Sequence, residues 1–337
     1  MRAYFNPMRD ETRTGKSERP KSAFLLSQLI LYQSRRKWGI VYSFATVVGL
    51  FCVIGNGHLT LGLELEDILA LTSNGILLSA ASFMIIIGMY VFNDLVDADI
   101  DRSNGKKRPI PSGDISKKDA WIFIITTNTV GVLLALMTFN LASTIIALMV
   151  VLVGLMYSAP KVALKDRFLL KTLSIAIAMM LCVMLGSTAC CYTNNTDHIA
   201  NMNSLIVPTH AFLMLGAMIF VTSPVSDAAD ITGDALAGRR TIPIVIGREN
   251  TIKMSILFAA NMSIVSWLLY SFYTIGLLTA ILVTIIVTVT IIDMVRNLKQ
   301  LRQREFVLDP RKKTMPLHMM LQASLVIGAL SFQTLHI

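Results

Sequence analysis

Aspartates recur with the same spacing at two places in the chain. The first run is Asn93-Asp94-Leu95-Val96-Asp97-Ala98-Asp99-Ile100-Asp101, and the second is Asp227-Ala228-Ala229-Asp230-Ile231-Thr232-Gly233-Asp234. Both contain D-x-x-D-x-x-x-D, a spacing that puts three carboxylates on one face of a helix. Three neighbouring carboxylates repel one another strongly at neutral pH unless cations lie between them. Hard oxygen ligands suit Mg²⁺, so the spacing predicts a magnesium site made by Asp94, Asp97, Asp101, Asp227, Asp230 and Asp234.

Basic residues follow each aspartate run. They lie in the segment Arg108–Gly113 after the first run, directly after the second run, and in a third segment, Tyr157–Lys165. Carboxylates that hold Mg²⁺ beside arginine and lysine side chains suit a diphosphate, because the metal bridges phosphate oxygens and the cations take up the remaining charge. There is no P-loop glycine pattern, so a nucleotide is not the expected carrier. The basic residues expected to contact the diphosphate are Arg108, Lys161, Lys165, Arg239 and Arg240.

The rest of the chain is apolar enough to lie in a membrane. Of its 337 residues, 54% are hydrophobic and 15% are charged, whereas soluble domains are about 25% charged. Because a membrane span takes ~20 residues, the sequence predicts an all-α polytopic membrane protein. The nine predicted transmembrane helices are 38–57, 73–93, 119–139, 141–159, 169–190, 206–226, 252–271, 274–294 and 315–334.

The distribution of basic residues predicts how the chain is oriented. All 30 lysines and arginines fall within, or at the edges of, alternate connections, namely 1–37, 94–118, 160–171, 227–251 and 295–314. Positive charge concentrates on the inner side of a membrane, so we predict that the N-terminus and both aspartate runs are inside. The net charge of +9 is explained by this asymmetry beside anionic lipid and does not indicate nucleic-acid binding.

The N-terminal region differs from the rest. Residues 1–37 are predicted to form a basic tail, in which the apolar segment 22–34 is too short to span and is expected to lie along the inner interface. The run Arg35-Arg36-Lys37 is interpreted as a determinant of topology. Residues 38–337 are predicted to form the transmembrane domain.

Three inner segments together resemble the UbiA-type intramembrane prenyltransferase superfamily. Asn93-Asp94-x-x-Asp97-x-x-x-Asp101 is similar to its first aspartate motif, and Asp227-x-x-Asp230-x-x-Gly233-Asp234 is similar to its second. Tyr157-Ser158, with Lys161 and Lys165, resembles the loop whose tyrosine and lysines face the diphosphate. The resemblance covers about residues 35–335 and implies nine helices around a central cavity. It also adds Asn93 and Tyr157 to the residues expected to bind the diphosphate. Lys171 is a departure, because many members have a small residue or asparagine there.

The resemblance implies a Mg²⁺-dependent transfer of a polyprenyl group from its diphosphate to a lipophilic acceptor, with release of pyrophosphate and with the six aspartates as catalytic residues. The segment Asp101–Gly113 is similar to the branches that make archaeal ether lipids and chlorophyll. We therefore favour geranylgeranyl transfer onto a prenylated glycerol phosphate, at the cytoplasmic side of the cell membrane.

Three alternatives remain open from the sequence. The acceptor could be an aromatic ring of the quinone or chlorophyll pathway, or the protein could be a UbiA-type terpene cyclase that uses no acceptor. A non-enzymatic ion transporter is the third. It is disfavoured because the ionisable clusters lie at the inner edge of the spans, whereas transport pathways place charges near the midplane.

Overall fold

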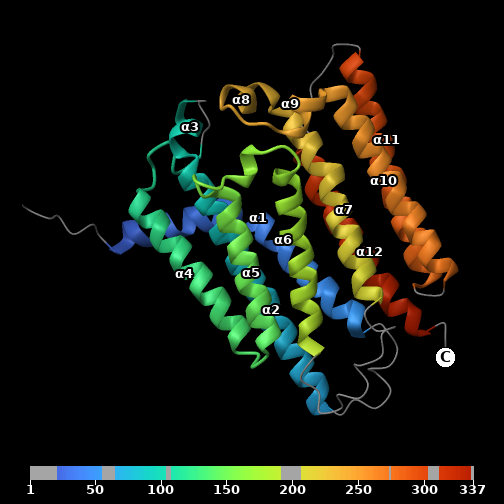
Figure 1. Cartoon of the computed structure of the whole chain (residues 1–337). Coiled ribbons are helices and arrows are strands. Elements are labelled where there is room, and N and C mark those ends of the chain that lie inside the picture. Colours follow the sequence, from blue (N-terminus) through green and yellow to red (C-terminus); the bar gives the residue numbers. More distant parts are fainter. Residues whose placement is uncertain are drawn as a thin grey trace, which may run out of the picture.

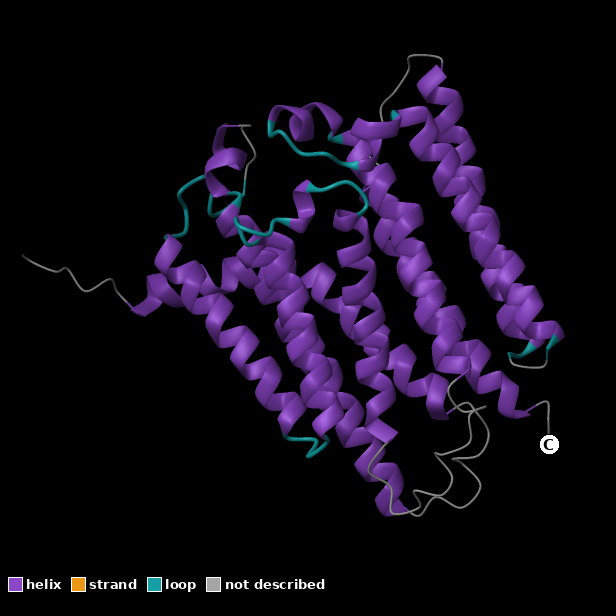
Figure 2. Ribbon diagram, viewed as in Figure 1, coloured by secondary structure: helices purple, strands orange, loops and turns teal. Residues whose placement is uncertain are grey.

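The computed structural model describes residues 21–54, 65–103, 108–190, 206–272, 275–302 and 311–334. Within these residues every regular element is a helix (Figure 2). The α-helices are α1 (Lys21–Ile54), α2 (Leu65–Val96), α3 (Ala98–Ser103), α4 (Lys117–Leu136), α5 (Leu141–Ser158), α6 (Leu170–Ser187), α7 (Ile206–Ala229), α8 (Ile231–Leu236), α9 (Ile242–Ile246), α10 (Arg248–Ser271), α11 (Leu277–Arg302) and α12 (Arg311–Thr334). Two 3₁₀ turns, η1 (Leu164–Asp166) and η2 (Thr188–Cys190), flank α6.

In the described residues, nine helices are long and apolar enough to cross a membrane. They are α1, α2, α4, α5, α6, α7, α10, α11 and α12, which confirms the nine predicted spans. The two spans that nearly abut in the sequence separate at Phe139, which has a φ of 52°. Asn140 then caps α5, because its side-chain oxygen accepts a hydrogen bond from the backbone N–H of Ala142 at 2.9 Å.

The first helix is longer than the predicted span. Residues 22–34, expected as a separate interfacial segment, are continuous with the first span in the 34-residue helix α1. Leu31 in this segment is buried, and the Gln28 side chain donates a hydrogen bond to the backbone oxygen of Asp119 at 3.2 Å. The predicted boundary at residue 37 thus falls inside one helix, and residues 1–20 of the basic tail lie outside the described residues.

Helix α1 packs in backbone contact with α6. A Cβ atom on Gly49 would lie 1.9 Å from the Val183 oxygen, and one on Gly186 would lie 1.8 Å from the Thr46 oxygen. Such close approach is typical of membrane helices, because lipid supplies no hydrophobic driving force between them and packing decides their association. Helix α1 also contacts α2, α7 and α12. It therefore places its own side chains next to those of the helices that carry the aspartate runs.

The two aspartate runs lie at the same end of the bundle. Helices α2 and α7 run in the same direction, and the short helices α3 and α8 that follow them lie together at one end with α9 (Figure 1). Each long helix breaks within its run, at Asp97 and at Asp230. The chain nevertheless continues to turn, because Asp101 donates its N–H to the Asp97 oxygen at 2.8 Å and Asp234 donates to the Asp230 oxygen at 3.0 Å. These breaks bring both runs to one cavity.

Candidate functional site

A cavity of about 380 Å³ lies between the middle of α1 and the ends of α2, α5, α6, α7 and α12. Both aspartate runs contribute to its wall, and arginines and a lysine line it beside them. The charged lining residues are Arg35, Asp97, Arg108, Lys171, Asp227, Asp230, Asp234 and Arg239. The cavity is therefore the place where the carboxylates and cations predicted from separate segments meet.

Two arginines hold the first aspartate run. Arg35, from α1, contacts Asp94 with two guanidinium nitrogens, one of them 2.6 Å from Oδ2 and the other at Oδ1. Arg108 donates from a single nitrogen to Asp94 Oδ1 at 2.9 Å and to Asp101 Oδ2 at 2.7 Å. Asp99, the fourth aspartate of this run, is exposed, whereas Asp94, Asp97 and Asp101 are buried. Their repulsion is relieved by the chain's own arginines and by the lysine that contacts Asp97.

Asp97, the middle aspartate of the first run, has two cationic partners. The Lys165 ammonium lies 2.7 Å from Asp97 Oδ1, and an Arg239 nitrogen lies 2.9 Å from the same oxygen. Burial alone would raise the pKa of Asp97, but Lys165 and Arg239 outweigh it and the pKa lies below its ordinary value. Lys165 reaches this position because Ala163, with a left-handed φ of 41°, turns the chain into η1.

Lys171 is the main partner of the second aspartate run. Its ammonium is 2.7 Å from Asp227 Oδ1 and 3.5 Å from Asp234 Oδ2. The other oxygen of Asp227, Oδ2, is buried and accepts no hydrogen bond within the described part of the chain. Arg239 connects the two runs, because it also lies 3.3 Å from Asp234 Oδ1 in addition to its contact with Asp97. One guanidinium therefore couples carboxylates that are far apart in the sequence.

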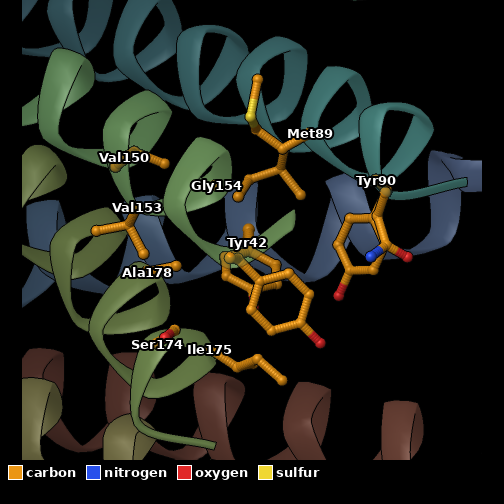
Figure 3. Close-up of a pocket in the computed structure, with 12 residues that line it drawn as sticks. Tyr42, Met89, Tyr90, Val150, Val153, Gly154, Ser174, Ile175 and Ala178 are labelled. Atoms are coloured by element: carbon orange, nitrogen blue, oxygen red, sulfur yellow. The ribbon is translucent and has the colours of Figure 1, made fainter. Parts of the chain in front are cut away.

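An apolar pocket lies next to this cavity, between α1, α2, α5 and α6. Its volume is about 110 Å³, and its side chains include Met89, Val150, Val153 and Ala178 (Figure 3). The pocket and the charged cavity are adjacent, because five residues line both: Tyr42, Tyr90, Asn93, Tyr157 and Ile175. A ligand with a charged head and an apolar tail would fit across this junction.

The structure brings most of the predicted site residues together. Asn93, Tyr157, Arg108 and Arg239 line the cavity. Lys165 does not line it but forms an ion pair with Asp97, which does. Asp94 and Asp101 do not line this cavity but hold Arg108, which does. Lys161 and Arg240 were expected to contact the diphosphate, yet both are exposed and neither lines the cavity.

Sequence reasoning missed Arg35 and did not assign Lys171 a partner. Arg35 was interpreted only as a topology determinant, but it forms an ion pair with Asp94. A signal was available in the helical spacing, because Arg35, Trp38 and Tyr42 follow at intervals of three and four residues and all three line the cavity. Lys171 was recognised as a departure from the family, and the structure shows that it pairs with the second run.

The residues fit a magnesium ion, although not in the arrangement expected. We predicted that each run would gather three carboxylates, but no group of three metal-binding side chains gathers in the described residues, where lysines and arginines pair with the aspartates. The donors themselves suit Mg²⁺, since they are carboxylate oxygens and Asp227 Oδ2 is available. Four cationic and four carboxylate side chains line the cavity, so its formal charge cancels. A diphosphate would therefore need an additional cation.

Comparison with known proteins agrees with this geometry. The chain belongs to the UbiA prenyltransferase family, which it matches over residues 43–307. It is 30% identical over 194 residues to a digeranylgeranylglyceryl phosphate synthase of Saccharolobus solfataricus, covering 57% of this chain and 64% of that protein. It is 30% identical over 209 residues to the synthase of the same name from Sulfurisphaera tokodaii, covering 60% of this chain and 70% of that protein. The match to the first of these thus spans less than two thirds of the relative's length.

Solved structures show the same fold. A structure of digeranylgeranylglyceryl phosphate synthase aligns with a TM-score of 0.63 at 22% identity and covers 91% of this chain and 99% of that chain. A UbiA homolog from Archaeoglobus fulgidus bound to GPP and Mg²⁺ aligns with a TM-score of 0.60 at 18% identity, covering 92% and 100%. Together with its nine apolar helices, these likenesses identify the protein as a multi-pass membrane protein with the UbiA fold.

Proposed function

We propose that this protein transfers a polyprenyl group from its diphosphate to a lipophilic acceptor and releases pyrophosphate, with Mg²⁺ as cofactor. The observation that carries the proposal is the convergence of both aspartate runs on one cavity that adjoins an apolar pocket. A prenyl diphosphate has the same two parts, a charged head and an apolar tail. The family membership of the chain and the A. fulgidus homolog bound to GPP and Mg²⁺ support the proposal.

The diphosphate binds in the charged cavity. Arg35, Arg108, Lys171 and Arg239 are the cations that line it, and each is held by aspartates that fix its position. Fixed cations stabilise the charge that develops on a departing group without first having to reorganise. Asp227 and Asp234 would hold Mg²⁺, which when bound supplies further positive charge to the departing pyrophosphate.

The prenyl tail occupies the apolar pocket, so that its first carbon lies at the junction with the cavity. Loss of pyrophosphate leaves an allylic cation at that carbon. The aromatic side chains of Tyr42, Tyr90 and Tyr157 line the junction, and the face of an aromatic ring attracts positive charge. The surrounding apolar side chains keep water away from the cation until the acceptor attacks.

The names of the relatives favour a glycerol-derived acceptor. Both relatives described above are digeranylgeranylglyceryl phosphate synthases. We therefore propose geranylgeranyl transfer onto the free hydroxyl of a prenylated glycerol phosphate. An aromatic acceptor of the quinone or chlorophyll pathway is the second candidate, because the segment Asp101–Gly113 also resembles the chlorophyll branch.

The experiment that tests the function is a product analysis. The purified full-length protein is given Mg²⁺, geranylgeranyl diphosphate and either geranylgeranylglyceryl phosphate or an aromatic quinone precursor, and products are identified by mass spectrometry beside a pyrophosphate assay. We expect an ether-linked product, with pyrophosphate released in equal amount. A cyclic hydrocarbon formed without acceptor would identify a cyclase instead. Uptake of ions into sealed vesicles with no pyrophosphate release would identify a transporter.

We further propose that the cavity faces the cytoplasm in the cell membrane. Ser112 is exposed in the loop after the first aspartate run, and Phe139 is exposed in the turn between α4 and α5 at the other end of the bundle (Figure 1). In a variant lacking Cys190 and Cys191, we expect an impermeant thiol reagent added to whole cells to label Phe139→Cys but not Ser112→Cys. The reverse pattern would invert the orientation.

A further inference from the structure

One wall of the cavity carries neutral polar groups in place of ion pairs. It is formed by α7 and α12, and its lining residues are Thr222, Ser223, Ser226, Thr314 and His318. The apolar pocket proposed to hold the prenyl tail, the tail pocket, is lined by other helices, namely α1, α2, α5 and α6. A second substrate that approaches the reacting carbon must therefore come from a side other than the tail pocket, and the wall of α7 and α12 is such a side.

His318 has a nitrogen without a partner on this wall. The side chain is 1% exposed, and its Nε2 lies 3.0 Å from Thr222 Oγ1. Its Nδ1 is buried and has no hydrogen-bond partner in the described residues. A buried polar atom left unpaired costs about 1–3 kcal/mol, and because His318 lines the cavity, a ligand bound there that donates a hydrogen bond to Nδ1 would recover this cost.

The hydrogen bonds define which nitrogen carries the proton. Thr222 Oγ1 lies 2.8 Å from the backbone oxygen of Met218, which can only accept, so the threonine hydroxyl donates there. Its single hydrogen is then used, and His318 must donate from Nε2 to the threonine oxygen. A neutral imidazole that is protonated at Nε2 has a lone pair at Nδ1. The unpartnered nitrogen is therefore an acceptor.

We propose that Nδ1 of His318 accepts the hydroxyl hydrogen of the acceptor substrate, an inference that rests on the proposed prenyl transfer. In this proposal the reacting group of the acceptor is a hydroxyl. Thr222 lies five residues before Asp227 on α7, about 7 Å along a helix axis. This offset suits an acceptor bound next to a diphosphate that is held at the aspartates.

The step balances in atoms and electrons. The bond between C1 of the prenyl chain and the diphosphate oxygen breaks, and its electron pair leaves with pyrophosphate. A lone pair of the substrate hydroxyl forms the new C–O bond, and the hydroxyl proton passes to Nδ1. Nε2 keeps its own proton, which it donates in the hydrogen bond to Thr222 Oγ1. The attack first gives a protonated ether, which is strongly acidic. A neutral imidazole is therefore a sufficient base to remove its proton.

Three variants of the full-length protein test this role. His318→Leu removes the acceptor nitrogen, and His318→Asn keeps a hydrogen-bonding group but removes the base. His210→Asn is the matched control, since His210 is also buried and also contacts a hydroxyl, that of Ser266 at 3.0 Å, but does not line the cavity. Two quantities are measured for each. They are the thermal stabilisation by geranylgeranyl diphosphate with Mg²⁺, and the single-turnover transfer to geranylgeranylglyceryl phosphate over a range of acceptor concentrations.

We expect all three variants to keep the stabilisation by prenyl diphosphate. General-base removal typically costs about 10²–10⁴ in rate, so both His318 variants should transfer at least about 100-fold more slowly. His318→Asn should keep an acceptor KM within about threefold of wild type, His318→Leu should raise it, and His210→Asn should transfer within twofold of wild type. The proposal is overturned if His318→Leu transfers at the wild-type rate, or if both His318 variants lose diphosphate binding too. Failure of the proposed function is distinct, because the wild type itself would then form no transfer product with geranylgeranylglyceryl phosphate.

Discussion

In the first aspartate run every carboxylate contacts an arginine or a lysine, whereas in the second run Asp227 keeps a buried oxygen that accepts no hydrogen bond in the described structure. The spacing of the two runs is identical, so spacing alone does not create this difference. The difference arises from the cationic side chains that contact each run. Arg35, Arg108 and Lys165 converge on the first run from three separate segments, while the second run relies on Lys171 and shares Arg239.

The difference indicates that the two runs have separate tasks. In the first run the aspartates hold cations that come from separate segments of the chain, which fixes the positions of those cations. Asp227 also contacts a cation, Lys171, but its second oxygen is buried and unpaired, and the cost of leaving it so is recovered when a cation binds. We therefore propose that the first run positions arginines of the cavity and that the second run is where an added cation would bind. Four substitutions test this division, beginning with the residue that connects both runs.

Arg239 should give the largest effect, because it contacts Asp97 of one run and Asp234 of the other. Removing one donor that stabilises a developing anion typically costs about 10²–10³ in rate. We expect Arg239→Ala to lower the single-turnover rate about 100-fold or more at saturating Mg²⁺ and prenyl diphosphate. The neighbouring Arg240 is exposed, and Arg240→Ala should change the rate less than twofold. Similar losses in both variants would show that the rate depends on net loop charge and not on the contacts of Arg239.

Neutralising one carboxylate should lower the thermal stability of the protein more in the first run than in the second. Asp97→Asn leaves Lys165 and Arg239 without their shared partner, and Lys165 and Asp97 are both buried. Breaking a buried ion pair from one side costs about 3–5 kcal/mol, so the thermal midpoint of the ligand-free protein should fall by several degrees. Asp227→Asn should lower the midpoint less, because Lys171 remains close to Asp234. Thermal unfolding in detergent measures both, and equal losses would contradict the division of tasks.

The stabilisation that Mg²⁺ and diphosphate give to the protein should depend more on the second run than on the first. A ligand that binds only the folded state raises the midpoint with its affinity. If the second run holds the added cation, Mg²⁺ with diphosphate should stabilise wild type clearly, and Asp227→Asn should lose most of this stabilisation. Lys165→Ala removes a partner of the first run. This variant should still be stabilised by Mg²⁺ with diphosphate, while its single-turnover rate falls about tenfold. Lys161→Ala is the control from the same loop, because Lys161 is exposed. A loss of metal dependence in Lys165→Ala alone would assign the cation to the first run.

The smallest effect concerns acid pH. The folded-state pKa of Asp97 lies below its ordinary value, because Lys165 and Arg239 outweigh its burial. Asp97 therefore contributes stability above the unfolded pKa of about 3.9, and this contribution is lost as pH falls through the lower folded value. We expect the difference in thermal midpoint between wild type and Asp97→Asn to stay constant from pH 7 to about 5 and to shrink below about pH 4. A difference that does not change down to pH 3 would show that the ion pair does not stabilise the fold.

The sequence alone determined the spans and the two aspartate runs. Both are local patterns, because a membrane span is defined by its own apolar length and a carboxylate face by helical spacing. The turn between α4 and α5, inferred from charge, coincides with the backbone break at Phe139 and Asn140. These features needed no knowledge of which helices are neighbours.

Only the tertiary structure decided which cations meet which carboxylates. Arg35 and Arg36 are adjacent in the sequence, as are Arg239 and Arg240, and spacing does not tell the members of either pair apart. Arg35 faces Asp94 because α1 packs beside α2. Lys165 reaches Asp97 only because Ala163 adopts a left-handed turn, and Arg239 follows Gly238, whose φ is 69°. Backbone turns and helix packing act between segments that are distant in the chain, and for this reason the ion pairs of the site, and the free nitrogen of His318, could not be derived from residue types alone.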